Sequence, residues 1–279
     1  MKWLFALLLA LIIFGGAALV SWKLIFKPQI QVQKEQRGEV PLPPVRDVAL
    51  PEFQAAAKLR QEGKLTDARA ALSTFLQKYP DGLHTDEAKD LLGEVNMQIL
   101  MSPEPAPEKQ EYIVKPGDVL QRVAARTKST PELIMRTNNM TGTMLRIGQK
   151  LQISHPDFSL LMQRNAKTLT LLDRAAFFKR YRILNINIPG KAQPKITTKV
   201  AEIFAWYDGK RIGIGSREYP ISTRWIRLAT PHYMIYAEAD TAFPVLGAPA
   251  PATGLSMAAG DLAELSALVN RTTPVTITD

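Results

Sequence analysis

The sequence of 279 residues contains no cysteine. A chain without thiols forms no disulfide, holds no zinc through cysteine ligands and attacks no substrate through a thiolate. Histidine is scarce too, with only His84, His155 and His232, and their wide separation gives none of the spacings typical of metal ligands. We therefore expect neither a metal nor a cofactor.

Compact blocks of lysine and arginine interleaved with aromatic residues are also missing, and aromatic residues make up only 8% of the chain. The 35 basic residues nevertheless outnumber the 26 acidic ones, which gives a formal net charge of +9. This balance favours an anionic partner, such as an anionic lipid surface or a cell-wall polymer. Without a basic block we expect no binding to nucleic acid. The length and the 46% of hydrophobic residues are typical of about two globular domains.

The N-terminus carries the one long apolar run. No charged or strongly polar residue interrupts the stretch from Trp3 to Val20, which lysines flank on both sides. A run of about 18–20 residues is closer to a membrane-spanning helix than to the shorter core of a cleaved signal. We predict that residues 1–27 anchor the chain in a membrane, with a signal peptide cleaved near Ala17 as the alternative. Lysines on both flanks leave the orientation open.

Two proline-rich segments divide the rest of the chain. Residues 28–50 read as an extended tether, and residues 102–110 as a short, stiff linker. Between them, residues 51–101 show apolar residues at helical spacing, interrupted by a turn around Gly63 and by Tyr79-Pro-Asp-Gly, with Thr85 as the expected cap of the last helix. The order of small residues, glycine turn and Tyr-Pro resembles tetratricopeptide repeats. The unit is either a helical spacer or a surface for a protein partner or a dimer.

Residues 111–154 have the most specific pattern. A short alternating strand at Tyr112 leads to the turn Lys115-Pro-Gly-Asp118 and a short helix; Thr130 and Pro131 then begin a second helix, and a closing strand ends near Ile153. The predicted order is strand, helix, helix, strand. This segment resembles the LysM domain, whose pattern Y-x-V-x-x-G-D-T-L, I-A, L-x-x-x-x-N-N, G-Q-x-L-x-I is met at every anchor except Val119 in place of threonine.

The resemblance implies binding of a glycan that contains N-acetylglucosamine, such as peptidoglycan or chitin, in a shallow groove between two loops. Asp118 has an alternative role that is purely structural, because an aspartate before a helix can cap its N-terminus. The resemblance places residues 117–120 on one side of the groove and residues 139–147 on the other; the candidate binding residues among them are Gly117, Asp118, Val119, Leu120, Asn139, Met140, Leu145 and Ile147.

Residues 156–279 are rich in alternating strands and predict a mainly-β domain. The end of the chain resembles the catalytic end of the L,D-transpeptidase (YkuD-like) family. It consists of Gly247 to Met257, an acidic helical turn and then Arg271-Thr-Thr-Pro-Val-Thr-Ile. The resemblance implies a β-sandwich fold. Aligned without gaps, the Ser-His-Gly-Cys core of the family falls on Pro251 to Gly254. Degenerate positions are Tyr236 in place of the family's histidine, Ala252, Gly254 in place of the cysteine, and Ser256 in place of the arginine.

The sequence thus predicts a multidomain α+β protein with a membrane helix, a small tetratricopeptide-like unit, a LysM module and a mainly-β YkuD-like domain without catalytic residues. We expect a peptidoglycan-binding protein of the bacterial envelope, anchored in the inner membrane with its C-terminal domains in the periplasm. The resemblance implies that the C-terminal domain either recognises peptide stems without cutting them or serves as a scaffold. Alternatives are secretion after signal cleavage, an active L,D-transpeptidase-family enzyme with an unrecognised nucleophile such as Thr253 or Ser256, and an adaptor that recruits wall enzymes.

Overall fold

The computed structural model describes residues 47–189, 193–238, 251 and 253–279. The predicted membrane helix at 1–27, most of the tether at 28–50 and the degenerate position Ala252 lie outside these residues. The chain separates into two compact units, residues 1–48 and 49–279, and the second is described here. Within the described ranges, no helix is long and apolar enough to cross a membrane.

The helical unit contains three helices, as the spacing predicts: α3 (Leu50–Gln61), α4 (Leu65–Lys78) and α5 (Thr85–Met101). Gly63 takes a φ of +75° in the turn between α3 and α4, a conformation that glycine adopts without steric cost. The expected cap at Thr85 is wrong, because Thr85 is the first residue of α5 and its hydroxyl instead donates a hydrogen bond to the carbonyl of Tyr79.

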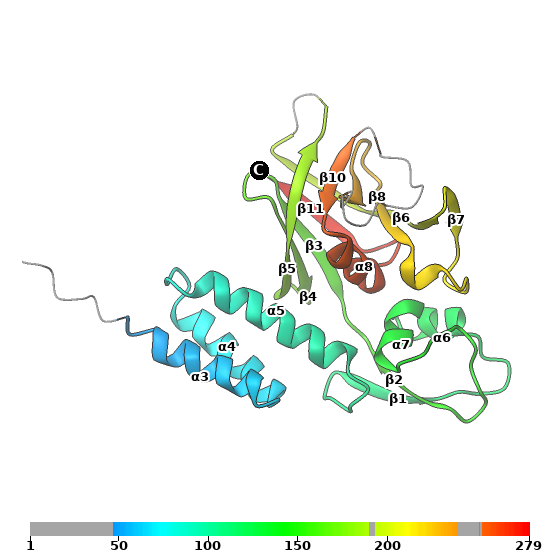
Figure 1. Ribbon diagram of the computed structural model, residues 1–279, viewed down its shortest axis with the longest axis horizontal. Helices are drawn as coiled ribbons and strands as arrows, with labels where there is room; N and C mark the ends of the chain where they lie inside the picture. The colour runs from blue at the N-terminus through cyan, green and yellow to red at the C-terminus, as the bar shows by residue number, and fades with distance from the viewer. Residues whose placement is uncertain (1–46, 190–192, 239–250, 252) are drawn as a thin grey trace, which may run out of the picture. The chain divides into compact units, whose positions relative to one another are not determined.

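The helix α5 lies against strand β5 (Ala176–Asn187) of the C-terminal domain (Figure 1). Gly93 makes this close approach possible, since a Cβ added there would lie 3.0 Å from Cγ of Lys179. The side-chain amide of Asn96 donates to the carbonyl of Phe178 at 2.8 Å, and Arg180 forms ion pairs with Asp86 and Asp90. One face of the helical unit is therefore occupied within the chain itself.

The segment that resembles LysM has the predicted β-α-α-β order: β1 (Lys109–Ile113), α6 (Leu120–Arg126), α7 (Pro131–Thr137) and β2 (Lys150–Ser154). Strands β1 and β2 pair antiparallel, and pairing begins at Lys109 opposite Ser154. The predicted N-terminus of α7 is confirmed, because the hydroxyl of Thr130 accepts a hydrogen bond from the backbone N–H of Leu133.

The C-terminal domain is mainly β, as expected, and its strands are joined in one continuous order. The order of the strands is β11-β3-β4-β5-β10-β9-β8-β6-β7, and β11 also pairs with β6. The last strand, β11, runs parallel to β3 and antiparallel to β6, so the strands from β11 to β6 form a closed ring and β7 stays at the edge. The long strands β5 and β6 bridge two groups of strands: β5 pairs first with β4 and then with β10, and β6 first with β11 and then with β8. The elements not yet given are β3 (Phe158–Gln163), β4 (Thr168–Asp173), β6 (Lys195–Tyr207), β7 (Lys210–Ile212), the 3-10 helix η2 (Tyr219–Ile221), β8 (Thr223–Leu228), β9 (Met234–Ala237), β10 (Gly254–Met257), α8 (Ala259–Leu268) and β11 (Pro274–Thr278).

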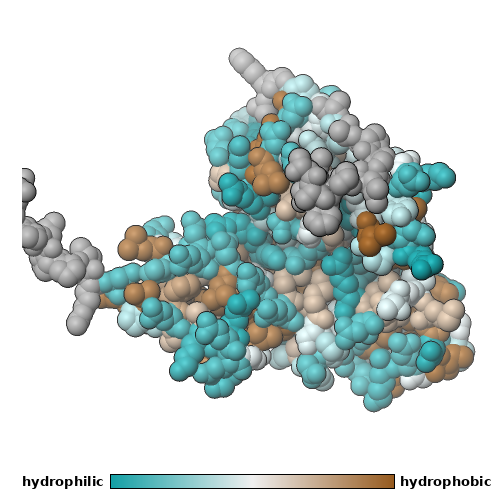
Figure 2. All heavy atoms as spheres, in the orientation of Figure 1, coloured by the Kyte–Doolittle hydropathy of each residue, from teal (hydrophilic) through white to brown (hydrophobic). Residues whose placement is uncertain are grey.

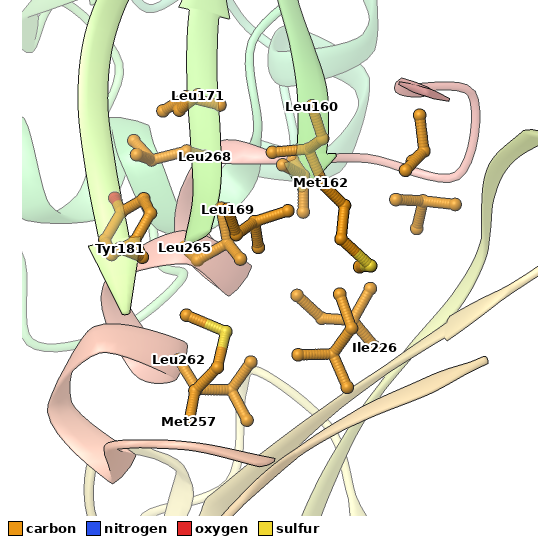
Figure 3. Packing of buried hydrophobic residues seen from close by; sticks show 14 of the residues in the cluster. Leu160, Met162, Leu169, Leu171, Tyr181, Ile226, Met257, Leu262, Leu265 and Leu268 are labelled. Atoms are coloured by element: carbon orange, nitrogen blue, oxygen red, sulfur yellow. The ribbon is translucent and has the colours of Figure 1, made fainter. Parts of the chain in front are cut away.

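The core of this domain forms between the strands and α8. Figure 3 shows leucines 262, 265 and 268 of α8 pointing toward apolar side chains of β3, β4, β8 and β10. Leu133 from α7 and Leu100 from α5 belong to the same buried cluster. The LysM segment and the helical unit therefore contribute directly to the core of the C-terminal domain.

Candidate glycan-binding site

The turn before α6 is organised by the carboxylate of Asp118. It accepts hydrogen bonds from the hydroxyl of Tyr112 at 2.6 Å and from the backbone N–H of Lys115 at 2.9 Å, and it pairs with Arg126 at 2.7 Å. The expected role as a helix cap is wrong, since the residue at the N-cap of α6 is Val119. Asp118 holds the loop that the sequence assigned to the groove.

These contacts lower the pKa of Asp118 well below its ordinary value of 3.8, with the hydrogen bond from Tyr112 as the largest cause. A lowered pKa in the folded state means that the carboxylate stabilises the fold above its ordinary pKa and ceases to do so as the pH falls through the folded-state value. We expect Asp118→Asn to lower the melting temperature at neutral pH, and the difference from the natural protein to shrink in strong acid. Thermal unfolding over a pH series measures this. Asp157→Asn, at an exposed carboxylate, serves as the control, and a difference independent of pH would contradict the assignment.

An open pocket of about 680 Å³ lies along the loop between α7 and β2. Three residues predicted for the groove line it, namely Asn139, Met140 and Ile147. Asn139 has a φ of +52° and Gly148 a φ of +83°, so left-handed residues at both ends bend this loop around the pocket. Thr141, Gly142, Met144 and Arg146, which lie inside the predicted range 139–147, line it too. Gly148 and Gln149 are the lining residues that the sequence reasoning missed, and they directly follow that range.

The other predicted groove residues lie elsewhere. Leu120 is fully buried in the core of the LysM segment, so its side chain is not available to a surface ligand, and Leu145 packs partly against the same core. Gly117 and Val119 are exposed in the neighbouring turn and do not line the pocket of about 680 Å³. Hydrogen bonds between Val114 and the pair Gly148–Gln149 join the two loops, as a two-sided groove requires.

Apolar side chains reach the surface of this segment, visible in Figure 2 as brown areas among hydrophilic ones. Met144 is 85% exposed and Ile147 is 72% exposed, both beside the pocket. Exposed apolar groups next to backbone polar groups can pack on the apolar face of a sugar while the backbone bonds its acetamido group.

A polar cluster fixes the LysM segment on the C-terminal domain. Glu132 of α7, only 7% exposed, accepts hydrogen bonds from Arg136 and from the hydroxyl of Tyr219 at 2.6 Å. The guanidinium of Arg224 lies 3.5 Å from the same carboxylate and 3.7 Å from the ring centre of Tyr219. Burial and, secondly, the charge of Glu132 raise the pKa of Tyr219, so this phenol stays protonated and donates. The hydroxyl of Thr130 also donates to the carbonyl of Ala267 in α8.

Three of the positions that the sequence alignment assigned to catalytic residues lie on adjacent strands; Gly254 and Ser256 are buried and Tyr236 is half-buried. Ser256 on β10 is opposite Tyr236 on β9, and its hydroxyl is buried without a hydrogen-bond partner among the described residues. Burial, and secondly the charge of Glu238, raises the pKa of Tyr236. Neither Ser256 nor the buried Gly254 offers a group that a substrate could reach.

Gly254, which the ungapped sequence alignment assigned to the family's cysteine, has no room for a side chain. Its φ of +142° is a conformation that side chains rarely adopt, and an added Cβ would collide with the carbonyl oxygen of Met234. The backbone conformation and the neighbouring strand therefore both require glycine at this position.

Comparison with known proteins supports the assignment of the LysM segment. The LysM domain model matches residues 112–154, so this part of the chain is a LysM domain. A search of curated protein sequences finds no match.

Solved structures similar to this chain are L,D-transpeptidases. One from Mycobacterium smegmatis has a TM-score of 0.31 and 9% sequence identity, and the match covers 48% of this chain and 65% of that one. L,D-transpeptidase 1 of Mycobacterium tuberculosis has a TM-score of 0.30 and 8% identity, covering 47% and 67%. An L,D-transpeptidase from Stackebrandtia nassauensis has a TM-score of 0.31 and 10% identity, covering 44% and 56%.

Proposed function

We propose that this protein binds peptidoglycan, or another glycan containing N-acetylglucosamine, through its LysM domain. The observation that carries the proposal is the open pocket between Asn139 and Gln149, inside a segment that matches the LysM family and beside the exposed Met144 and Ile147. The predicted groove residues Gly117, Asp118 and Val119 would form the second wall. The net charge of +9 suits an anionic wall polymer.

The C-terminal domain, in this proposal, is a YkuD-like domain that performs no acyl transfer. Thiolate catalysis needs a cysteine and a base within hydrogen-bond reach. The chain has no cysteine, Gly254 leaves no space for one, and Tyr236 stands in place of the histidine. The domain would instead act as a support for the glycan-binding domain.

A tryptophan at position 142 tests the glycan pocket. Gly142 lines it, has an ordinary φ and has no atom within 4 Å of an added Cβ, so Gly142→Trp fills the pocket without straining the fold. We expect binding of the full chain to purified sacculi to weaken about tenfold or more, which corresponds to about 1.4 kcal/mol. Co-sedimentation measures the effect.

Gly260→Trp is the matched control, because Gly260 is also exposed with open space around it but lies on α8. This variant should bind sacculi like the natural protein. Equal binding by both variants, or no binding by the natural protein, would contradict the proposal.

A second candidate function is that of a wall enzyme with an unrecognised nucleophile. The observation that favours it is that His232 and Thr253 line one pocket of about 410 Å³. A threonine hydroxyl acts as a nucleophile when a base reaches it, but no hydrogen bond joins these two side chains in the described part of the chain. Incubation with muropeptides separates the two functions: new cross-links or loss of tetrapeptide stems, abolished by Thr253→Val, would establish the enzyme.

The proposed site of action is the bacterial cell envelope. Anchoring in the inner membrane by residues 1–27, with the described domains in the periplasm, remains a prediction from the sequence, as does secretion after cleavage. A protein partner for residues 51–101 also remains a prediction; such a partner would meet α3 and the outer side of α4, because α5 is engaged with β5.

A further inference from the structure

A pocket of about 930 Å³, larger than the glycan pocket, opens where the LysM domain meets the C-terminal domain. Its lining comes from the stretch between α6 and the start of α7, from the connection 155–158 and from the turn 270–274 after α8. Arg174, in the hairpin turn between β4 and β5, lines it as well. No described residue lines both this junction pocket and the glycan pocket, so the two are separate sites.

Two basic side chains of the junction pocket have no partner that neutralises them. Lys128 and Arg271 are exposed, and neither side chain forms a hydrogen bond or an ion pair within the ranges that the structure describes. They belong to adjoining loops, because the hydroxyl of Thr130 donates to the carbonyl of Ala267 near the end of α8. Asp157 is the one carboxylate among the described lining residues, so positive charge prevails in the pocket.

Arg174 adds a third cation, held in place by the fold. Its guanidinium pairs with Asp173 at 3.2 Å and donates to the carbonyl of His155 at 2.9 Å. Arg174 has a φ of +49° and Ala175 a φ of +65°, and a two-residue hairpin turn of this kind favours asparagine and glycine. The turn itself therefore gives no reason for an arginine at this position, which indicates a role for the side chain.

Asn270 supplies an uncharged donor. Its carboxamide oxygen accepts hydrogen bonds from the backbone N–H of Thr272 at 2.9 Å and from the hydroxyl of Thr272 at 2.8 Å. This orientation leaves the amide nitrogen of Asn270 to donate elsewhere, and it has no partner among the described residues. Part of the remaining lining is apolar, with Leu133, Phe158 and Leu268.

This set of donors fits a phosphate group. Lysine meets a phosphate oxygen as a point charge, arginine bonds two oxygens at once, and the amide N–H is a further donor. A phosphate monoester carries more charge and more acceptor oxygens than a carboxylate, so it engages more of these donors together. The pocket also has room for more than the phosphate, and its apolar lining suits the carbon atoms of an ester.

We propose that the junction pocket binds a phosphate group, with Lys128, Arg271 and the amide of Asn270 as the donors. The phosphate belongs either to a lipid headgroup or to a soluble phosphate. The site lies outside the glycan pocket, so this proposal does not depend on the proposed glycan-binding function. It gives the junction of the two domains a binding role of its own.

Isothermal titration calorimetry on the full chain in a non-ionic detergent tests the site with two probes, inorganic phosphate and phosphatidic acid mixed into the detergent micelles. Lys128→Asn removes one charge and keeps a residue type that tolerates the φ of +52° at this position. Arg271→Gln removes the other charge. We expect each variant to bind about tenfold more weakly than the natural protein, as for the loss of one charge-assisted hydrogen bond.

The two probes distinguish the sources of the phosphate. Binding of phosphatidic acid without binding of inorganic phosphate, weakened in both variants, would support the site and assign it to a lipid headgroup. The reverse preference, weakened in the same variants, would support the site and assign it to a soluble phosphate.

Lys167→Asn is the matched control, because Lys167 is also exposed, also has a positive φ, of +50°, and does not line the junction pocket. This variant should bind like the natural protein; equal weakening would reveal attraction by net charge alone and overturn the pocket. Unchanged binding in both Lys128→Asn and Arg271→Gln would overturn it too, as would failure of the natural protein to bind either probe. Both substituted side chains are exposed, so we expect the variants to fold, which thermal unfolding checks.

Discussion

Glu132→Leu is expected to lower the free energy of unfolding by about 3–5 kcal/mol, the usual cost of removing one partner from a buried ion pair. The carboxylate meets Arg136, Arg224 and the hydroxyl of Tyr219 at the LysM junction. Without it, the guanidinium of Arg224, a residue only 3% exposed, keeps its charge in a site with little access to water. The LysM domain and the C-terminal domain should separate more easily as a result.

Denaturant unfolding measures this change, and Glu202→Leu is its matched control. Glu202 pairs with Arg227 at 2.9 Å on a partly exposed face of the sheet, so its loss should cost no more than about 1 kcal/mol. The double variant Glu132→Leu with Arg224→Leu should be less destabilised than the sum of the two single variants, because neither charge is then left alone. Additive effects would show that the two groups do not interact.

Gly254→Cys, which places a thiol at the position that the sequence alignment assigned to the nucleophile, is expected to destabilise the fold rather than create an enzyme. A side chain at this φ strains the backbone by about 1–3 kcal/mol. Overpacking against Met234 adds about 1–3 kcal/mol more. We therefore expect a loss of about 2–6 kcal/mol in the free energy of unfolding and no transpeptidation, even when Tyr236→His is added.

Thermal unfolding and a muropeptide cross-linking assay check these two expectations. Gly260→Ala is the control, since this exposed helical glycine has no neighbour within 4 Å of an added Cβ; it should be neutral or up to about 1 kcal/mol more stable. A Gly254→Cys variant as stable as the natural protein and with a reactive thiol would show that the strand can shift to accept a side chain, and would contradict this expectation.

Local pattern accounts for what the sequence predicted correctly. The helices of residues 50–101, the β-α-α-β order of the LysM domain and the Thr130 cap follow from periodicity, turn residues and capping, which involve residues close in the chain. The resemblance to LysM domains, not a local pattern, assigned Asn139, Met140 and Ile147 to the groove, and all three line one pocket because a single loop supplies them.

The predictions for individual side chains were wrong where one local pattern is compatible with two structural roles. Asp118 before a short helix is typical of a cap, but Tyr112 and Arg126 reach it from outside the turn and draw its carboxylate into their own network. Leu120 follows the groove residues in sequence, yet the first turn of α6 directs it into the core. Which side a residue faces depends on the element packed against it.

By itself the sequence determined the class of the LysM segment, the absence of thiol chemistry and the kinds of elements in each part. Only the tertiary structure decided that the strands close on themselves through β11 and β6, that Gly254 excludes a side chain, and that Glu132 of the LysM domain meets Arg224 of the C-terminal domain. These contacts join residues about a hundred positions apart, and no periodicity or turn signal encodes which distant groups share a buried site.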